Sequence, residues 1–285
     1  MKDKIKKFAV LGHPISHSLS PQIHFLFAKE FSINLEYKKF DIKENNLLER
    51  IESLKDEGYF GLNITLPLKY SVFQICDELS ERASFCKSVN TITFLKNKII
   101  GDSTDGRGLI SDLKNKNVLI KGISILLIGA GGAANGGIYD LIQSRPEKIY
   151  IINRTYTKAI EMKKYWELFA KKNQVSLEVI DLNFLFSKNL SSQYNFDLII
   201  NATSSSLTSQ DSPIPENTFN FLNKNGNCYD MMYGSETPFM RDAYKKTDLV
   251  YDGIGMLIEQ AATSFNIWHQ LQPSTKNIEV ALKDL

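Results

Sequence analysis

The chain has little cysteine, and its cysteines follow no recognisable spacing. Only 3 of the 285 residues are cysteine, and no C-x-x-C pair occurs. An odd number at unrelated spacings argues against a disulfide framework and favours reduced thiols, as in a cytoplasmic protein. A free cysteine packs as a small hydrophobic residue, so we expect Cys76, Cys86 and Cys228 in the core rather than in catalysis.

The few histidines do not form a metal-binding pattern. His13, His17, His24 and His269 show neither an H-E-x-x-H motif nor another paired ligand spacing. The sequence therefore predicts no metal site. We expect His17, which lies beside two serines, to pack within its loop or to support those serines.

The chain also lacks a dominant charge and a long hydrophobic run. Its 34 basic and 32 acidic residues give a formal net charge of +2, without a long run of one sign. This balance argues against a nucleic-acid or membrane-surface partner and favours a small-molecule ligand. No apolar run approaches the ~20 residues needed to cross a bilayer. The basic start lacks the apolar region of a signal peptide, so we expect a cytoplasmic protein.

The chain does contain alternating strand and helix patterns, and it is long enough for two domains. This alternation predicts an α/β fold with largely parallel sheets. A first series of patterns covers the strands 7–12, 36–42, 61–66 and 90–100 and the helix 20–31, where Ser20 can cap and Pro21 suits the first turn. A second series covers 123–142, 148–155, 196–203 and 226–233. It follows a predicted helix at 105–115, so we expect a domain boundary near residue 105.

The second series opens with a glycine-rich segment, "SILLIGAGGAANGG". Gly129, Gly131 and Ala134 fit the G-x-G-x-x-G/A pattern directly after an aliphatic strand. The helix that follows would point its N-terminal amides at a pyrophosphate. A glycine triple alone could be a turn, but the flanking strands and helix favour a Rossmann-type dinucleotide site. A Walker A loop is excluded because no Gly-Lys-Ser/Thr follows.

The end of the next predicted strand indicates which dinucleotide binds. An NAD site usually has an acidic residue there, which accepts a hydrogen bond from the ribose 2′-hydroxyl. This chain instead has "INRTYTK". Asn153, Arg154 and Thr155 offer donors and a cation, and Lys158 adds a charge one turn later, so the segment favours the 2′-phosphate of NADP. The alternative is that Arg154 is a solvated surface residue.

A candidate proton donor follows the strand pattern of "GLNITLPLK". Reduction of a ketone produces an alkoxide that must be protonated, and Lys69 could do this if a carboxylate controls its pKa. "GDSTDGRG" supplies Asp105 where the chain enters the second domain, so both side chains are expected near an interdomain cleft. Lys69 could otherwise be a surface lysine, and Asp105 could be a helix N-cap.

Motifs along nearly the whole chain resemble the shikimate dehydrogenase family, which reduces 3-dehydroshikimate to shikimate with NADPH. The resemblance rests on "LGHPISHSLSPQIHFLF", "GLNITLPLK", "SVNTITF", "GDSTDGRG", "GAGGAA", "NRT", "NATS", "YDMMY", "TPF" and "DGIGMLIEQAATSFNIW". The family belongs to the shikimate pathway of aromatic amino acid biosynthesis. The resemblance implies an oxidoreductase, and the histidine and cysteine patterns predict that it is metal-free and cytoplasmic. We expect a monomer or a homodimer.

The resemblance also implies roles for individual residues. Lys69 and Asp105 match the catalytic pair, and Ser18 and Ser20 match residues that hold the substrate carboxylate. The further substrate contacts that it implies are Thr65, Asn90, Tyr233 and Gln260. The cofactor contacts that it implies are Glu81, Gly129, Ala130, Gly131, Gly132, Ala133, Asn153, Arg154, Thr155, Lys158, Met231 and Gly253.

The resemblance further predicts a discontinuous first domain. Residues 1–105 would form the substrate-binding domain, and 106–252 the NADP-binding Rossmann domain. The helices of 253–285 would return to the first domain, which would bring Gln260 toward Lys69.

Two positions depart from the family pattern. Ser103 stands where asparagine is usual before Thr-Asp, and Ser206 stands where glycine is common after "NATSS". The first departure could loosen the setting of Asp105, and the second could alter a loop beside the cofactor.

Three alternative functions have different sequence requirements. An NAD-linked quinate/shikimate dehydrogenase would be expected to have an acid in place of "NRT". A methylenetetrahydrofolate dehydrogenase would not suit "HSLSP" or the helix that carries Gln260. A non-catalytic Rossmann-type nucleotide sensor would have no need to keep Lys69 and Asp105 together.

Overall fold

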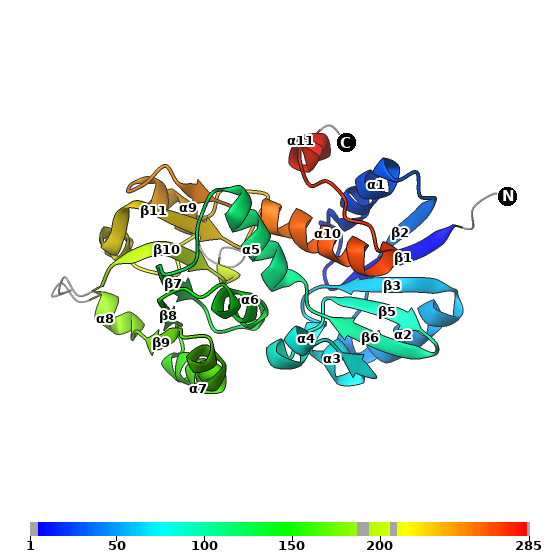
Figure 1. The fold of residues 1–285 in the computed structure, drawn as a ribbon, viewed down its shortest axis with the longest axis horizontal. Helices are drawn as coiled ribbons and strands as arrows, with labels where there is room; N and C mark the ends of the chain where they lie inside the picture. The colour runs from blue at the N-terminus through cyan, green and yellow to red at the C-terminus, as the bar shows by residue number, and fades with distance from the viewer. Residues whose placement is uncertain (1–4, 187–193, 206–209, 284–285) are drawn as a thin grey trace. The chain divides into compact units, whose positions relative to one another are not determined.

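The computed structural model describes residues 5–186, 194–205 and 210–283. The chain forms two compact units (Figure 1). Unit 1 contains Met1–Gly108 and Leu257–Leu285, and unit 2 contains Leu109–Met256. Both units are α/β, so the prediction of a two-domain α/β fold is confirmed. In the described parts of the chain no helix has the length and apolar character that a membrane span requires.

Unit 1 contains a mixed sheet in the order β2-β1-β3-β5-β6-β4. Its strands are β1 (Lys6–Gly12), β2 (Leu35–Asp41), β3 (Tyr59–Ile64), β4 (Glu78–Leu79), β5 (Thr91–Leu95) and β6 (Lys98–Asp102). Its shorter helices are α1 (Ser20–Glu30), η1 (Glu44–Asn46), α2 (Leu47–Asp56), α3 (Lys69–Ile75), α4 (Glu81–Cys86) and α11 (Ile278–Lys283). Two further helices, α5 (Asp105–Asn115) and α10 (Ile254–His269), contribute residues to both units.

The prediction of a single strand over 90–100 is wrong. This segment forms the hairpin of β5 and β6, and β5 is antiparallel to both β3 and β6. Lys96 and Asn97 between the strands have φ values of 48° and 67°. Two successive residues with positive φ allow a tight two-residue turn whose twist matches that of the flanking strands. Only part of this sheet is therefore parallel.

Side chains alternate between the two faces of the sheet in unit 1. Helices pack against the apolar side chains on both faces. Ala9 and Leu11 of β1 belong to one buried cluster with residues of α2, α3 and α4. On the opposite face, the ring of Phe8 stacks on Trp268 of α10, with the centroids 4.6 Å apart. A Cβ at Gly61 would lie 2.3 Å from the indole Nε1 of Trp268, so glycine permits the helix to approach this closely.

Helix α1 begins at Ser20 with a proline in its first turn, as the sequence suggests. The N-cap residue is Leu19, so the prediction that Ser20 caps the helix is wrong. The hydroxyl of Ser18 instead accepts a hydrogen bond from the backbone N–H of Ser20. Ser20, the first helical residue, is buried, and its hydroxyl accepts a hydrogen bond from the Ser18 hydroxyl.

Unit 2 has a parallel sheet in the order β12-β11-β10-β7-β8-β9. Its strands are β7 (Ser124–Ile128), β8 (Lys148–Ile152), β9 (Ser176–Val179), β10 (Phe196–Asn201), β11 (Leu222–Asp230) and β12 (Val250–Tyr251). Its helices are α6 (Gly132–Gln143), α7 (Tyr156–Lys172), α8 (Leu182–Phe186), η3 (Glu216–Phe221) and α9 (Pro238–Tyr244).

The strand order of unit 2 reverses between β7 and β10. Residues 125–128 of β7 are all buried, as expected for a central parallel strand that has helices on both faces. In open α/β sheets, ligands bind beyond the carboxyl ends of the strands at such a reversal. The glycine-rich segment follows β7 at this point, so the fold places it where a dinucleotide would bind.

Candidate active site

A lysine–carboxylate pair lies in unit 1. Lys69 is the first residue of α3, and Asp105 is the first residue of α5. The Lys69 Nζ lies 2.6 Å from Asp105 Oδ2, and the side chains are 20% and 10% exposed. Asp105 is thus a helical residue rather than the N-cap that the sequence left as an alternative. Its carboxylate contacts Lys69, which lies 36 positions earlier in the chain.

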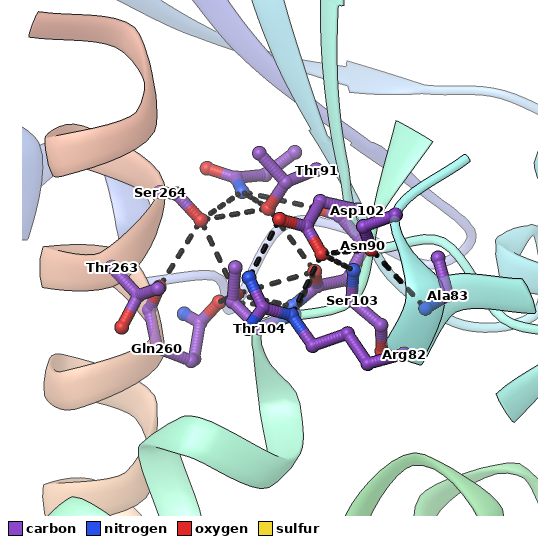
Figure 2. Close-up of polar contacts among 12 residues, drawn as sticks. Arg82, Ala83, Asn90, Thr91, Asp102, Ser103, Thr104, Gln260, Thr263 and Ser264 are labelled. Carbon is purple, nitrogen blue, oxygen red and sulfur yellow. Dashed lines mark hydrogen bonds and ion pairs between the residues drawn. The ribbon is translucent and has the colours of Figure 1, made fainter. Parts of the chain in front are cut away.

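The amide of Asn90 holds the same carboxylate from the other side. Its Nδ2 donates to Asp105 Oδ1 at 2.9 Å and lies 3.2 Å from Gln260 Oε1. Its Oδ1 accepts from the backbone N–H of Thr104 at 2.8 Å. Figure 2 shows Asn90, Thr104 and Gln260 converging from the bend before β5, the segment before α5 and helix α10. The structure therefore brings together the predicted Lys69, Asp105, Asn90 and Gln260.

The predicted carboxylate-binding serines lie in the chain between β1 and the first turn of α1. Ser18 Oγ donates to Ser20 Oγ at 3.2 Å. Thr65 lies beside the end of β1, because its backbone N–H donates to Leu11 O and its methyl group lies against Gly12. All three hydroxyl residues are thus near the carboxyl end of β1 or in the segment that follows it.

A partly buried ion pair anchors the segment that carries Asp105. Arg82 Nε donates to Asp102 Oδ1 at 2.7 Å, and Arg82 Nη2 donates to Asp102 Oδ2 at 2.6 Å. Ser80 Oγ and the backbone N–H of Ser103 also donate to Asp102 Oδ1. This fork geometry fixes the end of β6, three residues before Asp105 (Figure 2).

Ser103, which stands where the family pattern usually has asparagine, occupies a buried position. Its side chain is 1% exposed, and its hydroxyl has no hydrogen-bond partner among the described residues. Asp105 is nevertheless held by Lys69 and Asn90, so its setting does not depend on the side chain of Ser103. Ser206, the other departure, lies outside the described residues.

Sequence reasoning missed several polar residues that support the pair. The amide of Asn63 accepts from the Tyr37 hydroxyl at 2.7 Å and donates toward Thr91 and Ser264. Asn63 lies within the buried residues of β3, and Ser264 lies on the same helix as Gln260. A polar residue inside an otherwise apolar strand was the available signal, because a buried polar group needs a partner.

The candidate nucleotide site in unit 2 begins at the turn after β7. Gly129 has φ +109°, which favours glycine, and a Cβ there would meet Ala202 and Thr203 after β10. A Cβ at Gly131 or Gly132 would meet nothing within 4 Å, so the start of α6 is open to a ligand. The predicted pyrophosphate residues Ala130 and Ala133 belong to the same turn and first helical residues.

The segment after β8 has two exposed cations. The side chains of Arg154 and Lys158 are exposed and make no hydrogen bond or ion pair with the residues that the structure describes. Thr155, the N-cap of α7, is also exposed. Because no anion among the described residues neutralises these cations, the segment suits a phosphate group.

Asn153 has a structural contact that the sequence did not indicate. Its Oδ1 accepts from the backbone N–H of Ala130 at 3.2 Å, and its Nδ2 donates to Thr155 O at 2.9 Å. Asn153 therefore joins the segment after β8 to the glycine-rich turn. One amide hydrogen remains for the 2′-phosphate role that was predicted.

Met231 and Gly253 adjoin each other in unit 2. The N–H of Gly253 donates to Met232 O at 2.8 Å, and a Cβ at Gly253 would lie 2.2 Å from Met231 O. Only glycine permits this approach between the segment after β11 and the start of α10. The nearby Asp230 is buried and accepts hydrogen bonds from Asn201 and Thr237.

Two residues lie outside the unit that holds most of the residues predicted for the same ligand. Tyr233, predicted for the substrate, belongs to unit 2, and Glu81, predicted for the cofactor, is the first residue of α4 in unit 1. Burial raises the pKa of Tyr233, so its hydroxyl stays protonated and can donate a hydrogen bond. Both roles stay predictions.

The predicted absence of a metal also stays a prediction. Within residues 5–186, 194–205 and 210–283, no group of three or more His, Cys, Asp or Glu side chains is arranged to hold a metal ion. Cys86 and Cys228 are buried and Cys76 is partly buried. Burial raises the pKa of Cys76 and of Cys228 to about 12, which keeps both thiols protonated.

Three family models match successive parts of the chain. The shikimate dehydrogenase substrate binding domain matches residues 10–92, and the shikimate/quinate 5-dehydrogenase model matches residues 112–212. The shikimate 5′-dehydrogenase C-terminal domain matches residues 253–283.

Curated relatives and solved structures agree with these matches. The shikimate dehydrogenase (NADP⁺) of Methylobacillus flagellatus is 39% identical over 279 residues, which cover 97% of this chain and 98% of that protein. The enzyme of the same name from Vesicomyosocius okutanii is 40% identical over 276 residues, which cover 95% of this chain and 97% of that protein.

Among solved structures, the shikimate dehydrogenase of Aquifex aeolicus is 28% identical with a TM-score of 0.85, and the match covers 100% of both chains. The shikimate 5-dehydrogenase of Thermus thermophilus, solved with NADP(H) and shikimate, is 28% identical with a TM-score of 0.84. That match covers 98% of this chain and 99% of that one. With relatives of this identity and coverage, the chain belongs to the shikimate dehydrogenase family.

Proposed function

We propose that the chain catalyses the reversible NADPH-linked reduction of 3-dehydroshikimate to shikimate. The observation that carries the proposal is the partly buried contact of Lys69 with Asp105, with Asn90 and Gln260 beside it. A proton donor paired with a carboxylate, among amides that can bind hydroxyl groups, suits the reduction of a polyhydroxylated cyclic ketone. The names of the curated relatives support the same reaction.

Unit 1 supplies the acid–base chemistry in this proposal. Lys69 donates a proton to the carbonyl oxygen as the alcohol forms, and it accepts that proton in the reverse direction. The carboxylate of Asp105 holds the ammonium group in one orientation at 2.6 Å. Positioned general acids contribute roughly 10²- to 10⁴-fold to a rate, which is the share that we assign to Lys69.

Neutral groups bind the substrate. The hydroxyls of Ser18, Ser20 and Thr65, together with the phenol of Tyr233, donate hydrogen bonds to the carboxylate. Asn90, Asp105 and Gln260 contact the ring hydroxyls. Binding by several precisely placed polar groups gives selectivity, because an analogue that lacks one hydroxyl leaves its protein partner unpaired.

Unit 2 holds the dinucleotide in this proposal, and its residues fit one. Gly131 and Gly132 leave the start of α6 open for the pyrophosphate, and helix N-termini bind anions. Arg154 and Lys158 would bind the 2′-phosphate, with Asn153 and Thr155 as neutral donors. The bound cofactor supplies the hydride in the reduction. Met231 and Gly253 would lie along its nicotinamide end, and Glu81 near the cofactor.

The cations after β8 favour this proposal over an NAD-linked quinate/shikimate dehydrogenase. An NAD site needs an acceptor for the ribose 2′-hydroxyl, and no acidic residue stands at positions 153–158. A cytoplasmic location, and a monomeric or homodimeric state, are further parts of the proposal.

The test is the absorbance of NADPH when 3-dehydroshikimate is added to the purified chain. We expect rapid oxidation of NADPH and a kcat/KM that is at least about 10-fold lower with NADH, since one lost charge-assisted contact costs on the order of 1.5 to 3 kcal/mol. Quinate in place of shikimate, assayed with NADP⁺ and NAD⁺, tests the alternative. No turnover with 3-dehydroshikimate, or a preference for NADH, would overturn the proposal.

A further inference from the structure

A pair of buried hydroxyls joins helix α10 to strand β5 behind the candidate catalytic pair. Thr91 begins β5 and is 1% exposed, and Ser264 on α10 is fully buried. Their oxygens lie 2.7 Å apart although the residues are 173 positions apart in the chain. Figure 2 shows Thr91 and Ser264 directed toward each other and toward Asn90. Neither residue has a role in the proposed chemistry above.

The hydrogen-bond donors around this pair determine what it can do. Asn63 Nδ2 lies 3.1 Å from each of the two hydroxyl oxygens and 3.1 Å from Asn90 O. A backbone carbonyl can only accept, so the nitrogen of Asn63 faces the pair and supplies a hydrogen to it. When Ser264 donates to Thr91, the single hydrogen of Thr91 is directed to Asn90 Oδ1 at 3.0 Å.

The amide of Asn90 transmits this contact to the carboxylate. Its Oδ1 faces the N–H of Thr104, which can only donate, and its Nδ2 faces Asp105 Oδ1, which accepts. The amide orientation is therefore unique. The second oxygen of Asp105 accepts from Lys69. A continuous chain of hydrogen bonds thus leads from Ser264 through Thr91, Asn90 and Asp105 to Lys69.

The same hydroxyl pair fixes helix α10 at the position of Gln260. Ser264 lies one turn after Gln260, and its hydroxyl also approaches Gln260 O at 3.1 Å and Thr104 Oγ1 at 3.3 Å. Gln260 Oε1 lies 3.2 Å from Asn90 Nδ2. Loss of the contact between α10 and β5 would therefore disturb Asn90 from two directions.

We propose that Thr91 and Ser264 are positioning residues that hold Asn90, and through it Asp105, in the orientation that Lys69 needs. The proposal rests on the catalytic roles given to Lys69 and Asp105 above. In addition to carrying Gln260, helix α10 would then support the chemistry through the hydroxyl of Ser264. Small misplacements of a catalytic group are costly, by as much as roughly 10²-fold for 1 Å.

Thr91→Val is the main test, because valine keeps the shape of threonine and removes only the hydroxyl. We expect kcat for shikimate oxidation to fall roughly 10-fold while the KM for NADP⁺ changes by less than about 2-fold. The pH profile of kcat should also change, because Asn90 no longer fixes the carboxylate that holds the proposed proton donor Lys69. Thr91→Ser, which keeps the hydroxyl, should restore both values.

Ser264→Ala extends the test with a smaller change, and Thr263→Ala is its matched control. Thr263 lies on the same helix and also donates to a backbone carbonyl one turn earlier, at 3.0 Å, but it forms no hydrogen bond with Asn90. We expect Ser264→Ala to lower kcat in the same direction and Thr263→Ala to leave kcat and its pH profile unchanged. Since both hydroxyls act through one chain of contacts, the double variant should be about as slow as Thr91→Val alone.

A parental kcat and pH profile in Thr91→Val, with folding verified by circular dichroism and thermal melting, would overturn the proposal. An equal loss in Thr263→Ala, or a loss in Thr91→Val without a change in the pH profile and without rescue by Thr91→Ser, would also overturn it. Lys69→Ala, measured in parallel, distinguishes a failure of the positioning role from a failure of the catalytic role given to Lys69. If Lys69→Ala retains turnover, the catalytic assignment itself is wrong, whereas loss of turnover only in Lys69→Ala refutes the positioning role alone.

Discussion

Lys69 and Arg154 are both cations at predicted sites, but their surroundings differ. Lys69 is 20% exposed and lies against Asp105, whose other oxygen is held by Asn90. Arg154 is exposed and has no partner among the residues that the structure describes. A group that acts on a transition state gains from being fixed in advance. A group that binds an anion can instead be completed by the ligand, so the two sites should respond differently to mutation.

The largest expected effect is that of Lys69→Ala. We expect kcat to fall at least ~10²-fold while the affinity for shikimate changes little, because the amine acts mainly on the proton in the transition state. Steady-state kinetics and equilibrium binding of shikimate measure the two quantities. Lys98→Ala, which removes an exposed lysine that pairs with Glu78, is the control and should keep the parental kcat. Near-normal turnover in Lys69→Ala would show that Lys69 is not the proton donor.

The second expected effect tests the cofactor side. Arg154→Asp places an anion at the predicted phosphate site and an acceptor where NAD presents its 2′-hydroxyl. We expect kcat/KM for NADPH to fall roughly 10- to 100-fold, since a charge-assisted contact is lost. Activity with NADH should fall far less. Lys172→Asp, at the other end of α7, is a control for the charge change. An unchanged cofactor ratio would mean that Arg154 only faces solvent.

The third effect concerns stability, and it should arise in unit 1, which contains all four histidines. His24 is fully buried and stacks on Tyr37, with the ring centroids 4.5 Å apart. Burial, with a smaller contribution from His269, lowers the pKa of His24 from 6.5 to about 3.

Below pH 6.5 the unfolded chain therefore binds a proton at His24 that the native chain does not, so stability falls as the pH falls toward 3. Between pH 7.5 and pH 5 the free energy of unfolding should drop by about 2 kcal/mol from this residue. Urea titrations at both pH values measure the drop. His24→Phe should reduce it, whereas His17→Gln, at an exposed position, should not. An equal drop in parent and His24→Phe would contradict this account.

The smallest effect is expected at Ser103, within the otherwise well-bonded site of unit 1. Its buried hydroxyl has no hydrogen-bond partner in the described part of the chain, and an unpaired buried hydroxyl is destabilising. Ser103→Ala should raise the free energy of unfolding by about 1 kcal/mol and leave kcat unchanged. Urea denaturation and kinetics measure both. A clear loss of stability would show that the hydroxyl has a partner in solution.

The sequence predicted the two α/β domains and the Rossmann-type features because these depend on local patterns. An aliphatic strand, a glycine turn and a helix follow one another in a single segment. The hairpin of β5 and β6 was missed because "LKNK" carries no glycine, although Asn97 tolerates positive φ. The cap at Ser20 was wrong because the helix begins one residue earlier than the cap requires. Leu19 O accepts the hydrogen bond from the N–H of Ile23, which makes Leu19 the N-cap and Ser20 the first helical residue.

The supporting groups of the candidate site could not be predicted from spacing. Thr91 and Ser264 are 173 positions apart, and neither belongs to a pattern that marks a hydroxyl pair. Asn153 was predicted only as a phosphate donor, because its contact with Ala130 depends on how β7 and β8 pair. Such contacts arise from the tertiary arrangement of strands and helices, which local sequence does not determine.

We expect unit 1 to determine the rate of the chemical step and unit 2 to determine the choice of cofactor. The most direct measurement is the ratio of kcat/KM for NADPH to kcat/KM for NADH in the parent, Lys69→Ala and Arg154→Asp. We predict that Lys69→Ala lowers both values by the same factor and keeps the ratio, whereas Arg154→Asp lowers the ratio roughly 10-fold or more. A ratio that changes in Lys69→Ala, or one that stays constant in Arg154→Asp, would contradict this division of roles between the two units.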